Sequence, residues 1–306
     1  MSKTKFARST ILILTIAMAA CLTQPGCGKR DGAGGSGSVS KTTVQNIGSD
    51  TMVNLAQAWA EEYAKVEPSV SVEVSGGGSG IGVAALINGT AEIANCSRKL
   101  EPSEIEKAKA KHGSDPKEFM VGYDALSIYV HKDHPLNEIS IDDLAEIYKE
   151  GGTITKWSQL GVQAIPGGKG DDIVRVSRQN NSGTYHYFRE VVIGKKGDFK
   201  AGSVDLNGSK DVVELIAKTP NAIGYSGLGY ATPEVKILKV AKKKGEPAIQ
   251  PSIPTTLDKT YPIARPMFMY TPGNPPPHIQ KYLDWVMSEA GQKIVKDIGY
   301  VPLPKS

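Results

Sequence analysis

The sequence has 306 residues, and its 36 lysines and arginines nearly balance 32 aspartates and glutamates, which leaves a formal net charge of +4 at pH 7. It has no basic helix and no alternation of basic with aromatic residues, which argues against a nucleic-acid partner. The five histidines and three cysteines show no spacing typical of a metal site, so we expect neither a metal nor another cofactor.

The amino-terminal residues predict export. A basic start is followed by an apolar segment from Ile11 to Ala20, which is too short to span a bilayer comfortably and ends in small residues, so residues 1–20 resemble a secretory signal. Cys21 follows directly, in the context of a bacterial lipoprotein cleavage site, and Cys27 is the alternative. We therefore expect an exported chain in the periplasm or at the cell surface, held at a membrane by a lipid on Cys21.

A tether is predicted between the signal and the folded part. Residues 21–41 are rich in glycine and serine, which is typical of a flexible linker. The chain that follows is long enough for two lobes with substantial cores. Because Cys96 is the only cysteine in the sequence after the tether, no disulfide can form within the folded part.

The folded part begins with a strand, a polar loop and a helix. Thr43–Ile47 predicts the strand, and Gly48–Thr51 forms the loop. Apolar residues then recur at helical spacing from Met52 to Tyr63, which predicts an amphipathic helix. Asp50 and Thr51 are the residue types that cap helix starts, so one of them is expected to do so here.

A second unit of the same kind follows. Val70–Val74 alternates like a strand and runs into Ser75–Gly80, a loop in which four of six residues are glycine. A short helix through Leu86 is expected to end at Asn88-Gly89. No lysine stands at the spacing that a phosphate-binding P-loop requires, so the glycines indicate either a close backbone approach or positive φ angles.

A third strand–loop–helix unit lies in the middle of the chain. The apolar run Ile173–Ser177 predicts a strand, the loop Arg178–Thr184 follows, and Tyr185, Phe188 and Val192 mark one face of a helix. Repeated units of this kind predict an α/β fold with parallel strands, whose ligands bind beyond the carboxyl ends of the strands.

Two further strands suggest how the chain is divided. Val121–Val130 and Ala222–Gly227 are long apolar runs, and between them lies a segment with its own helices, including Ile141–Tyr148. An amphipathic helix through Ile279 and Met287 closes the chain. We therefore predict two lobes with a cleft between them. The predicted boundaries are 42–123 and 228–306 for lobe 1 and 124–227 for lobe 2.

The loop Arg178–Thr184 has the chemistry of a site for a tetrahedral oxyanion. A helix start presents free backbone N–H groups, and hydroxyls and a guanidinium beside it add further donors. Ser79 and Gly80 offer similar donors in the glycine-rich loop. Ser182 can alternatively be an ordinary helix cap, and Arg178 an ordinary ion-pair partner. Three loops of one kind in one chain favour the anion site.

Several segments, in order, resemble the phosphate-binding protein of bacterial phosphate ABC importers. They are Gly48–Thr51, Ser75–Gly82, Gly89–Arg98, Tyr123-Asp124, Arg178–Thr184, Asn221–Tyr225 and Gly299–Leu303. The resemblance implies a two-lobed periplasmic-binding-protein fold of type II. It also implies a monomer that binds inorganic phosphate with high affinity and delivers it to the transmembrane subunits of an ABC permease.

The resemblance also implies which residues contact phosphate. The first lobe is expected to supply hydroxyl and amide donors, and the second lobe a clamp around Arg178. The expected phosphate-binding residues are Asp50, Thr51, Ser79, Gly80, Ser97, Asp124, Arg178, Ser182, Gly183 and Thr184.

One position departs from the pattern of the family. Some members have an aspartate where this chain has Ser97, and such a carboxylate accepts the proton of phosphate and repels sulfate. Asp50 and Asp124 are the candidates here, although Asp50 can instead be a helix cap and Asp124 a hinge partner. The alternative ligand is therefore another tetrahedral oxyanion, such as sulfate or molybdate.

A secreted phosphatase is the alternative from a different class. Ser182 would then be a nucleophile, with His186 one helical turn away. A serine at a helix start beside a glycine is explained by hydrogen-bond donation alone, so we expect no catalytic residue.

Overall fold

The computed structural model describes residues 41–304. The predicted signal (1–20), nearly all of the predicted tether (21–41) and both candidate lipidation sites, Cys21 and Cys27, lie outside these residues. Among the residues described, no helix is both long enough and apolar enough to cross a membrane.

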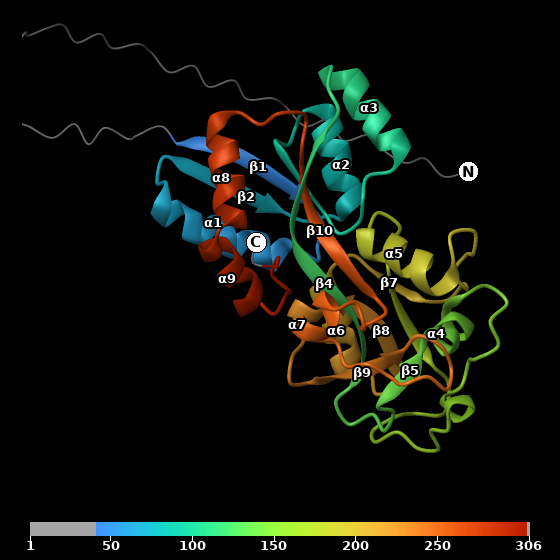
Figure 1. Ribbon diagram of the computed structural model, residues 1–306. Helices are drawn as coiled ribbons and strands as arrows, with labels where there is room; N and C mark the ends of the chain where they lie inside the picture. Colours follow the sequence, from blue (N-terminus) through green and yellow to red (C-terminus); the bar gives the residue numbers. More distant parts are fainter. Residues whose placement is uncertain (1–40, 305–306) are drawn as a thin grey trace, which may run out of the picture. The chain divides into compact units, whose positions relative to one another are not determined.

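A single mixed sheet runs through the described chain, and its strands form two groups that share β4 (Figure 1). The strand order is β2-β1-β3-β10-β4-β8-β6-β7, with β9 paired to β4 and β5 paired to β9. The strands are β1 Thr42–Gly48, β2 Val70–Ser75, β3 Ile93–Cys96, β4 Lys117–His131, β5 Glu138–Ser140, β6 Val174–Arg178, β7 Val204–Leu206, β8 Ala222–Gly227, β9 Val235–Ala241 and β10 Ala264–Thr271.

Helices cover both groups of strands (Figure 1). Those packed around β1–β3 and β10 are α1 Val53–Val66, α2 Ser79–Asn88, α3 Pro102–His112, α8 Pro277–Met287 and α9 Glu289–Asp297. Those of the other group are α4 Ile141–Tyr148, α5 Gly183–Phe188, α6 Ser209–Lys218 and α7 Ile253–Leu257, with short helical turns η1 Trp157–Leu160, η2 Arg189–Ile193 and η3 Leu228–Tyr230.

The predicted α/β fold with two lobes is confirmed. In the first group β1 is parallel to both β2 and β3, and in the second group β6 is parallel to both β7 and β8. Each parallel pair is joined through a helix, as the strand–loop–helix pattern predicted. The helix over Ile141–Tyr148 and the end of α2 before Gly89, which has a left-handed φ of 76°, also agree with the sequence.

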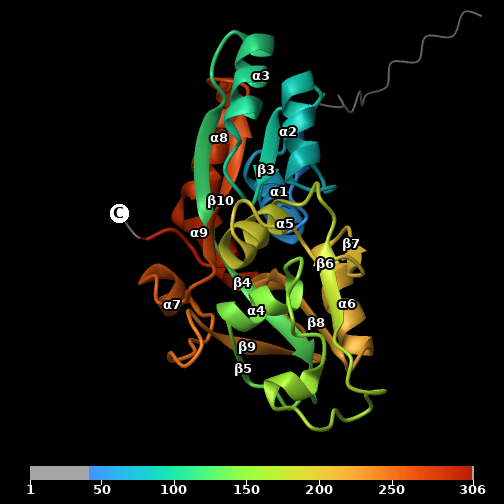
Figure 2. The ribbon, with the colours of Figure 1, turned by 90° about the vertical axis from the view of Figure 1, so that its right-hand side faces the viewer.

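The strand β4 runs from one lobe to the other, and β10 begins where the lobes meet (Figure 2). Lys117–Ala125 of β4 pairs with β10, whereas Leu126–His131 pairs with β8 and β9. The strand is therefore longer than the predicted Val121–Val130, and it belongs to both halves of the sheet. A residue in the middle of β4 or at the start of β10 lies where the lobes meet.

The strand β9 does not follow the predicted boundary at residue 228. It pairs with β5 and with the second half of β4, so its hydrogen bonds lie in the second lobe. The chain rejoins the strands of the first lobe at β10. We propose, for this reason, that the second lobe extends through β9, because hydrogen-bonded strands form one unit.

Apolar packing holds the loops at the ends of the strands in place. The predicted buried face of α1, which includes Leu55, Trp59 and Tyr63, lies in the core of the first lobe. In the second lobe the ring of Phe188 stacks on Tyr225 with centroids 3.8 Å apart. Tyr148 donates its hydroxyl to backbone carbonyls of β6 and β8. These contacts fix the strand that ends in Arg178.

Candidate functional site

The three predicted loops lie against one another in the structure. Asp50 accepts hydrogen bonds from the Gly77 N–H (2.9 Å) and from Nη2 of Arg178 (3.0 Å). Asn181 donates its side-chain amide to the Gly77 carbonyl, and its backbone carbonyl accepts from the Gly80 N–H, both at 3.0 Å. Residues of the two lobes are therefore bonded directly across the cleft.

Glycine is required where these loops approach each other. Gly78 has a φ of 97°, and a Cβ there would lie 2.6 Å from the carbonyl oxygen of Asn181. A Cβ on Gly183 would lie 2.3 Å from Oγ of Ser79 and 2.7 Å from Oγ of Ser97. The first turn of α5 thus meets the start of α2 with no room for a side chain between them.

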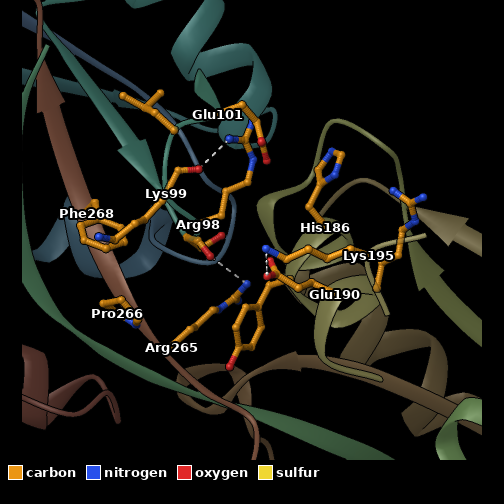
Figure 3. Close-up of a pocket in the computed structure, with 13 residues that line it drawn as sticks. Arg98, Lys99, Glu101, His186, Glu190, Lys195, Arg265, Pro266 and Phe268 are labelled. Carbon is orange, nitrogen blue, oxygen red and sulfur yellow. Dashed lines mark hydrogen bonds and ion pairs between the residues drawn. The ribbon is translucent and has the colours of Figure 1, made fainter. Parts of the chain in front are cut away.

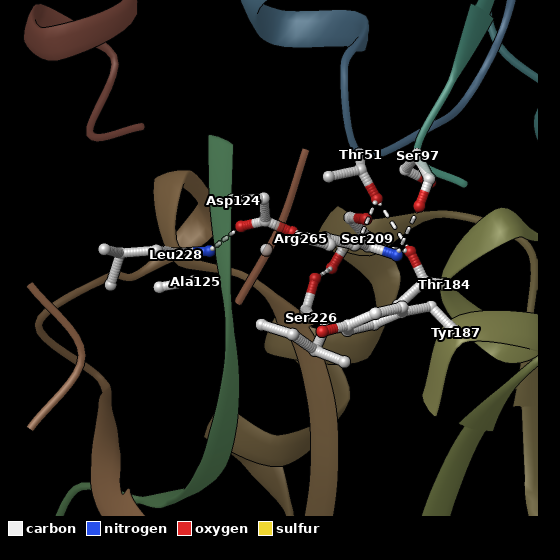
Figure 4. A network of polar contacts seen from close by, with 12 residues as sticks. Thr51, Ser97, Asp124, Ala125, Thr184, Tyr187, Ser209, Ser226, Leu228 and Arg265 are labelled. Carbon is white, nitrogen blue, oxygen red and sulfur yellow. Dashed lines mark hydrogen bonds and ion pairs between the residues drawn. The ribbon is translucent and has the colours of Figure 1, made fainter. Parts of the chain in front are cut away.

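Buried hydroxyls gather at this meeting point (Figure 4). The side chains of Ser49, Thr51, Ser79, Ser97 and Thr184 are all at most 2% exposed. Oγ1 of Thr51 and Oγ1 of Thr184, which come from opposite lobes, lie 2.8 Å apart. Ser49 donates to Ser97 at 2.9 Å, and the Ser97 N–H donates to Ser79 at 3.1 Å.

The centre of the cluster is Arg265, which the sequence analysis missed. Its Nη2 lies 3.2 Å from Oγ1 of Thr51 and 2.9 Å from Oγ1 of Thr184, and its Nη1 donates to the Ser97 carbonyl at 3.1 Å (Figure 4). The residue is 1% exposed. The sequence does contain one indication of its importance, because Arg265 is the single charged residue in the apolar stretch Ala264–Thr271.

Arg178 has a different set of partners. Its Nε donates to the carbonyls of Leu206 (3.3 Å) and Asn207 (3.0 Å), and its Nη1 donates to Ser209 (2.9 Å). Its Nη2 is shared between Asp50 and the Asn207 carbonyl. Burial lowers the pKa of Arg178, and the Asp50 carboxylate opposes that shift. The guanidinium that was expected to clamp the anion is bonded to protein acceptors on every nitrogen.

The two candidate carboxylates are both engaged. Oδ2 of Asp124 accepts from Nε and Nη2 of Arg265 at 3.2 and 2.9 Å, and its Oδ1 accepts from the Leu228 N–H at 3.0 Å. Asp50 does not cap α1, because that helix begins at Val53 and has no side-chain cap. Direct contact of either carboxylate with an anion stays a prediction.

Two tyrosines hold the loop that carries Thr51. Tyr230 donates its hydroxyl to the Asp50 carbonyl at 2.6 Å, and Tyr300 donates to the Thr51 carbonyl at 2.5 Å. Both rings are buried. The Tyr300 segment is itself fixed, because Val301 forms a β-bridge to Tyr123 of β4. The hydroxyl of Thr51 is therefore presented by a backbone with little freedom to move.

Ser182 is the N-cap of α5, as the simpler alternative proposed. Its Oγ accepts from the backbone N–H groups of Thr184 (3.1 Å) and Tyr185 (3.4 Å). His186 turns away from it, and its Nε2 lies 2.7 Å from the Asn180 carbonyl. Within residues 41–304, no group of three or more His, Cys, Asp or Glu side chains is placed to hold a metal ion.

Comparison with known proteins identifies the family. The model of the "PBP superfamily domain" matches residues 34–290. The phosphate-binding protein PstS of Pseudomonas aeruginosa is 34% identical over 271 residues, which cover 85% of this chain and 83% of that protein. The chain belongs to the PstS family of phosphate-binding proteins.

Other members of the family agree. PstS of Bacillus subtilis is 31% identical over 258 residues, which cover 84% of this chain and 79% of that protein. The crystal structure of a putative phosphate ABC transporter substrate-binding protein from Clostridium perfringens, with bound phosphate, matches with a TM-score of 0.74 and 28% identity. That match covers 86% of this chain and all of the other.

Proposed function

We propose that the protein binds inorganic phosphate in the cleft between its lobes and delivers it to an ABC permease. The observation that carries the proposal is the convergence of Arg265 with Thr51 and Thr184, one hydroxyl from each lobe, in a buried site. A phosphate beside these hydroxyls would accept hydrogen bonds from both lobes at once and hold the cleft closed. The names of the relatives support phosphate as the ligand.

The donors available can account for tight binding. A hydrogen bond to a charged group contributes about 1.5–3 kcal/mol. Micromolar affinity requires about 8 kcal/mol after the costs of desolvation and closure have been met. Ser79, Ser97 and Thr184 supply hydroxyls, and Gly183 supplies an N–H group close to them, whereas the Gly80 N–H is bonded to the Asn181 carbonyl. Several such bonds, together with Arg265, suffice.

The remaining predicted residues have supporting roles in this proposal. Asp50 and Arg178 join the lobes beside the anion, and Ser182 shapes the start of α5. Asp124 orients Arg265 and balances its charge. Because a hydroxyl both donates and accepts, the serines and threonines can accept a hydrogen bond from the phosphate O–H while both carboxylates remain engaged.

The same geometry supports binding without catalysis. A nucleophilic Ser182 would need a base within hydrogen-bonding reach. Its Oγ is instead occupied by two backbone N–H groups, and His186 contacts a carbonyl.

Calorimetric titration tests the proposal. Phosphate added to the purified protein in phosphate-free buffer should bind with micromolar or tighter affinity, and sulfate should bind more weakly. An absence of phosphate binding would refute the proposal. Equal binding of sulfate, or preferential binding of molybdate, would support the alternative of another tetrahedral oxyanion.

We also propose that the chain is exported and anchored at a membrane through a lipid on Cys21. The basic and apolar start of the sequence supports this location. Labelling cells with a radioactive fatty acid tests it. A Cys21→Ser variant should lose the label and a Cys27→Ser variant should keep it; the reverse result would move the anchor to Cys27.

A further inference from the structure

Tyr187 of α5 contacts two consecutive residues at the start of β10. Its hydroxyl donates to the Ala264 carbonyl at 2.6 Å. The guanidinium carbon of Arg265 lies over its ring, 5.3 Å from the ring centroid (Figure 4). Because α5 belongs to the second lobe and β10 pairs with β3 and β4 in the sheet of the first, both contacts join the lobes beside the proposed anion position.

The helix α5 presents two side chains to the same guanidinium group. Tyr187 follows Thr184 by three residues, and residues three apart are neighbours on the surface of a helix. Oγ1 of Thr184 lies 2.9 Å from Nη2 of Arg265. One face of α5 therefore places a hydroxyl at the edge of the guanidinium and an aromatic ring against its face.

The other contacts of Arg265 lie along the edge of the group. Its Nε and Nη2 bond Asp124, its Nη1 bonds the Ser97 carbonyl, and its Nη2 also reaches Thr51. The N–H groups of a guanidinium point outward in its plane, so such bonds leave its faces free to stack on an aromatic ring. Tyr187 supplies that ring, and its contact completes the surroundings of the group.

Both parts of the Tyr187 side chain suit this position. Burial raises the pKa of Tyr187 to about 12, and the positive charge of Arg265 opposes that shift. The phenol is therefore protonated near neutral pH and can donate to the Ala264 carbonyl. The face of the ring carries the negative part of its quadrupole, which attracts the guanidinium.

Tyr187 also helps to cover Arg265. Both residues line a cavity of about 780 Å³ between the loop after β3 and α5 (Figure 3). Arg265 is nevertheless only 1% exposed. Electrostatic attraction weakens where water reaches the charges. A smaller side chain at position 187 would leave one face of the guanidinium turned toward this space.

We infer that Tyr187 is a positioning residue, which holds Arg265 in its anion-binding orientation and slows the release of phosphate. The inference rests on the proposed function, because it concerns the same anion position. Tyr187 acts through Arg265 and needs no contact with the anion. When the lobes separate, α5 moves away from β10, so the Tyr187 ring, its hydroxyl and Thr184 leave the start of β10 together. Release of phosphate therefore requires all three contacts to break.

Paired variants test this role. Tyr187→Phe removes the hydroxyl contact and keeps the ring, whereas Tyr187→Leu removes both. Tyr185→Phe and Tyr185→Leu make the same changes two residues earlier on α5. The ring of Tyr185 packs against Phe199, with centroids 4.5 Å apart, and it does not line the cavity. Both tyrosines are half-buried, so the two pairs are matched.

Calorimetry should show that phosphate affinity falls about threefold in Tyr187→Phe and about tenfold in Tyr187→Leu, because the second variant loses the ring as well as the hydroxyl. Both Tyr185 variants should stay within about twofold, because they leave Arg265 untouched. A chase of bound radioactive phosphate with excess unlabelled phosphate measures the dissociation rate, which should rise by the same factors. A residue that only supported the fold would make the ligand-free protein less resistant to urea without raising this rate.

Combination with Arg265→Lys shows whether Tyr187 acts through Arg265. Lysine has no planar group to stack on the ring, so Tyr187→Leu should cost about twofold or less in that background. An equal loss in both backgrounds, or an unchanged dissociation rate in Tyr187→Leu, would overturn the inference and leave the proposed function intact. Failure of the unmodified protein to bind phosphate would refute the proposed function itself.

Discussion

Two buried arginines stand at the cleft, and their surroundings differ. Arg178 and Arg265 are both 1% exposed, and each is paired with an aspartate distant in sequence. Arg178 directs its nitrogens at backbone carbonyls, a serine and Asp50. Arg265 directs Nη2 at the hydroxyls of two threonines. The two arginines differ in whether their hydrogen-bond partners can rearrange to make room for a ligand.

A hydroxyl can rotate and exchange partners, whereas a buried carbonyl cannot. If Arg178 turned toward a ligand, the carbonyls of Leu206 and Asn207 would lose a donor, and an unsatisfied buried acceptor costs about 1–3 kcal/mol. Thr51 and Thr184 can instead reorient their hydroxyls toward an anion and keep accepting from Arg265. We therefore propose that Arg265 binds the anion and that Arg178 holds the lobes together.

The sharpest test of this comparison is Arg265→Ala. Truncating one member of a buried charge pair costs about 2–5 kcal/mol, so phosphate affinity should fall roughly 30-fold or more. Unfolding should also become easier by about 3–5 kcal/mol, because Asp124 is left buried without its partner. Calorimetry and urea denaturation measure the two effects.

Arg265→Lys separates binding from folding. It keeps the positive charge beside Asp124 but loses the planar fork, whose Nη2 reaches both threonines while its Nη1 bonds the Ser97 carbonyl. It should therefore fold better than Arg265→Ala and still bind phosphate poorly. Full phosphate affinity in either variant would contradict the central role of Arg265.

Gly183→Ala tests the close approach of the lobes and should have the next largest effect. The added Cβ would lie 2.3 Å from Oγ of Ser79, so either α5 or α2 must move away. We expect an approximately tenfold loss of phosphate affinity, which is about 1.4 kcal/mol, measured by calorimetry. Gly80→Ala is the milder control, because its Cβ would lie 3.2 Å from the Asn181 carbonyl. Equal losses in the two variants would argue against this geometry.

Arg178→Ala should weaken phosphate binding by about fivefold, roughly 1 kcal/mol, through the lost contact between the lobes. If Arg178 acts only through Asp50, then Asp50→Asn should cause a similar loss. The double variant should then lose little more than either single variant, which calorimetry of all three can measure. A loss in Arg178→Ala far beyond that of Asp50→Asn would place Arg178 on the anion, as its motif first indicated.

Asp124→Asn should have the smallest effect, a loss of about threefold, because the remaining carbonyl oxygen of asparagine can still accept from Arg265, although its amide nitrogen cannot accept from the Leu228 N–H. If Asp124 only orients Arg265, phosphate and sulfate affinities should fall in parallel. Paired titrations with the two anions measure this. A loss confined to phosphate would instead identify Asp124 as the acceptor of the phosphate proton.

The sequence predicted those parts of the site that depend on local pattern. The strand–loop–helix units placed Thr51, Ser79 and Arg178 at the carboxyl ends of strands, where the structure brings them together. Arg265 lies inside a strand and has no such motif. It stands opposite Asp124 in the register of β10 with β4, and the two are 141 residues apart. Only the pairing of distant strands brings them together, and local periodicity contains no information about that pairing.

The pairing of β9 could not be predicted from local pattern for the same reason. Its apolar run predicts a strand equally well in either lobe. The partner of that strand is decided by hydrogen bonds to β5 and β4. Sequence pattern therefore predicted the elements and the three loops, but not which lobe each late element joins.

The insertion of β10 between β3 and β4 has a consequence for how the protein folds. Until residues 264–271 are in place, β3 has an unpaired edge. Thr51 obtains its contact with Tyr300 later still, because the two residues are 249 positions apart. Contacts between such distant residues form slowly. We therefore expect the first lobe to stay open until the chain is nearly complete. Slow folding of this kind would suit the export that we propose for this chain.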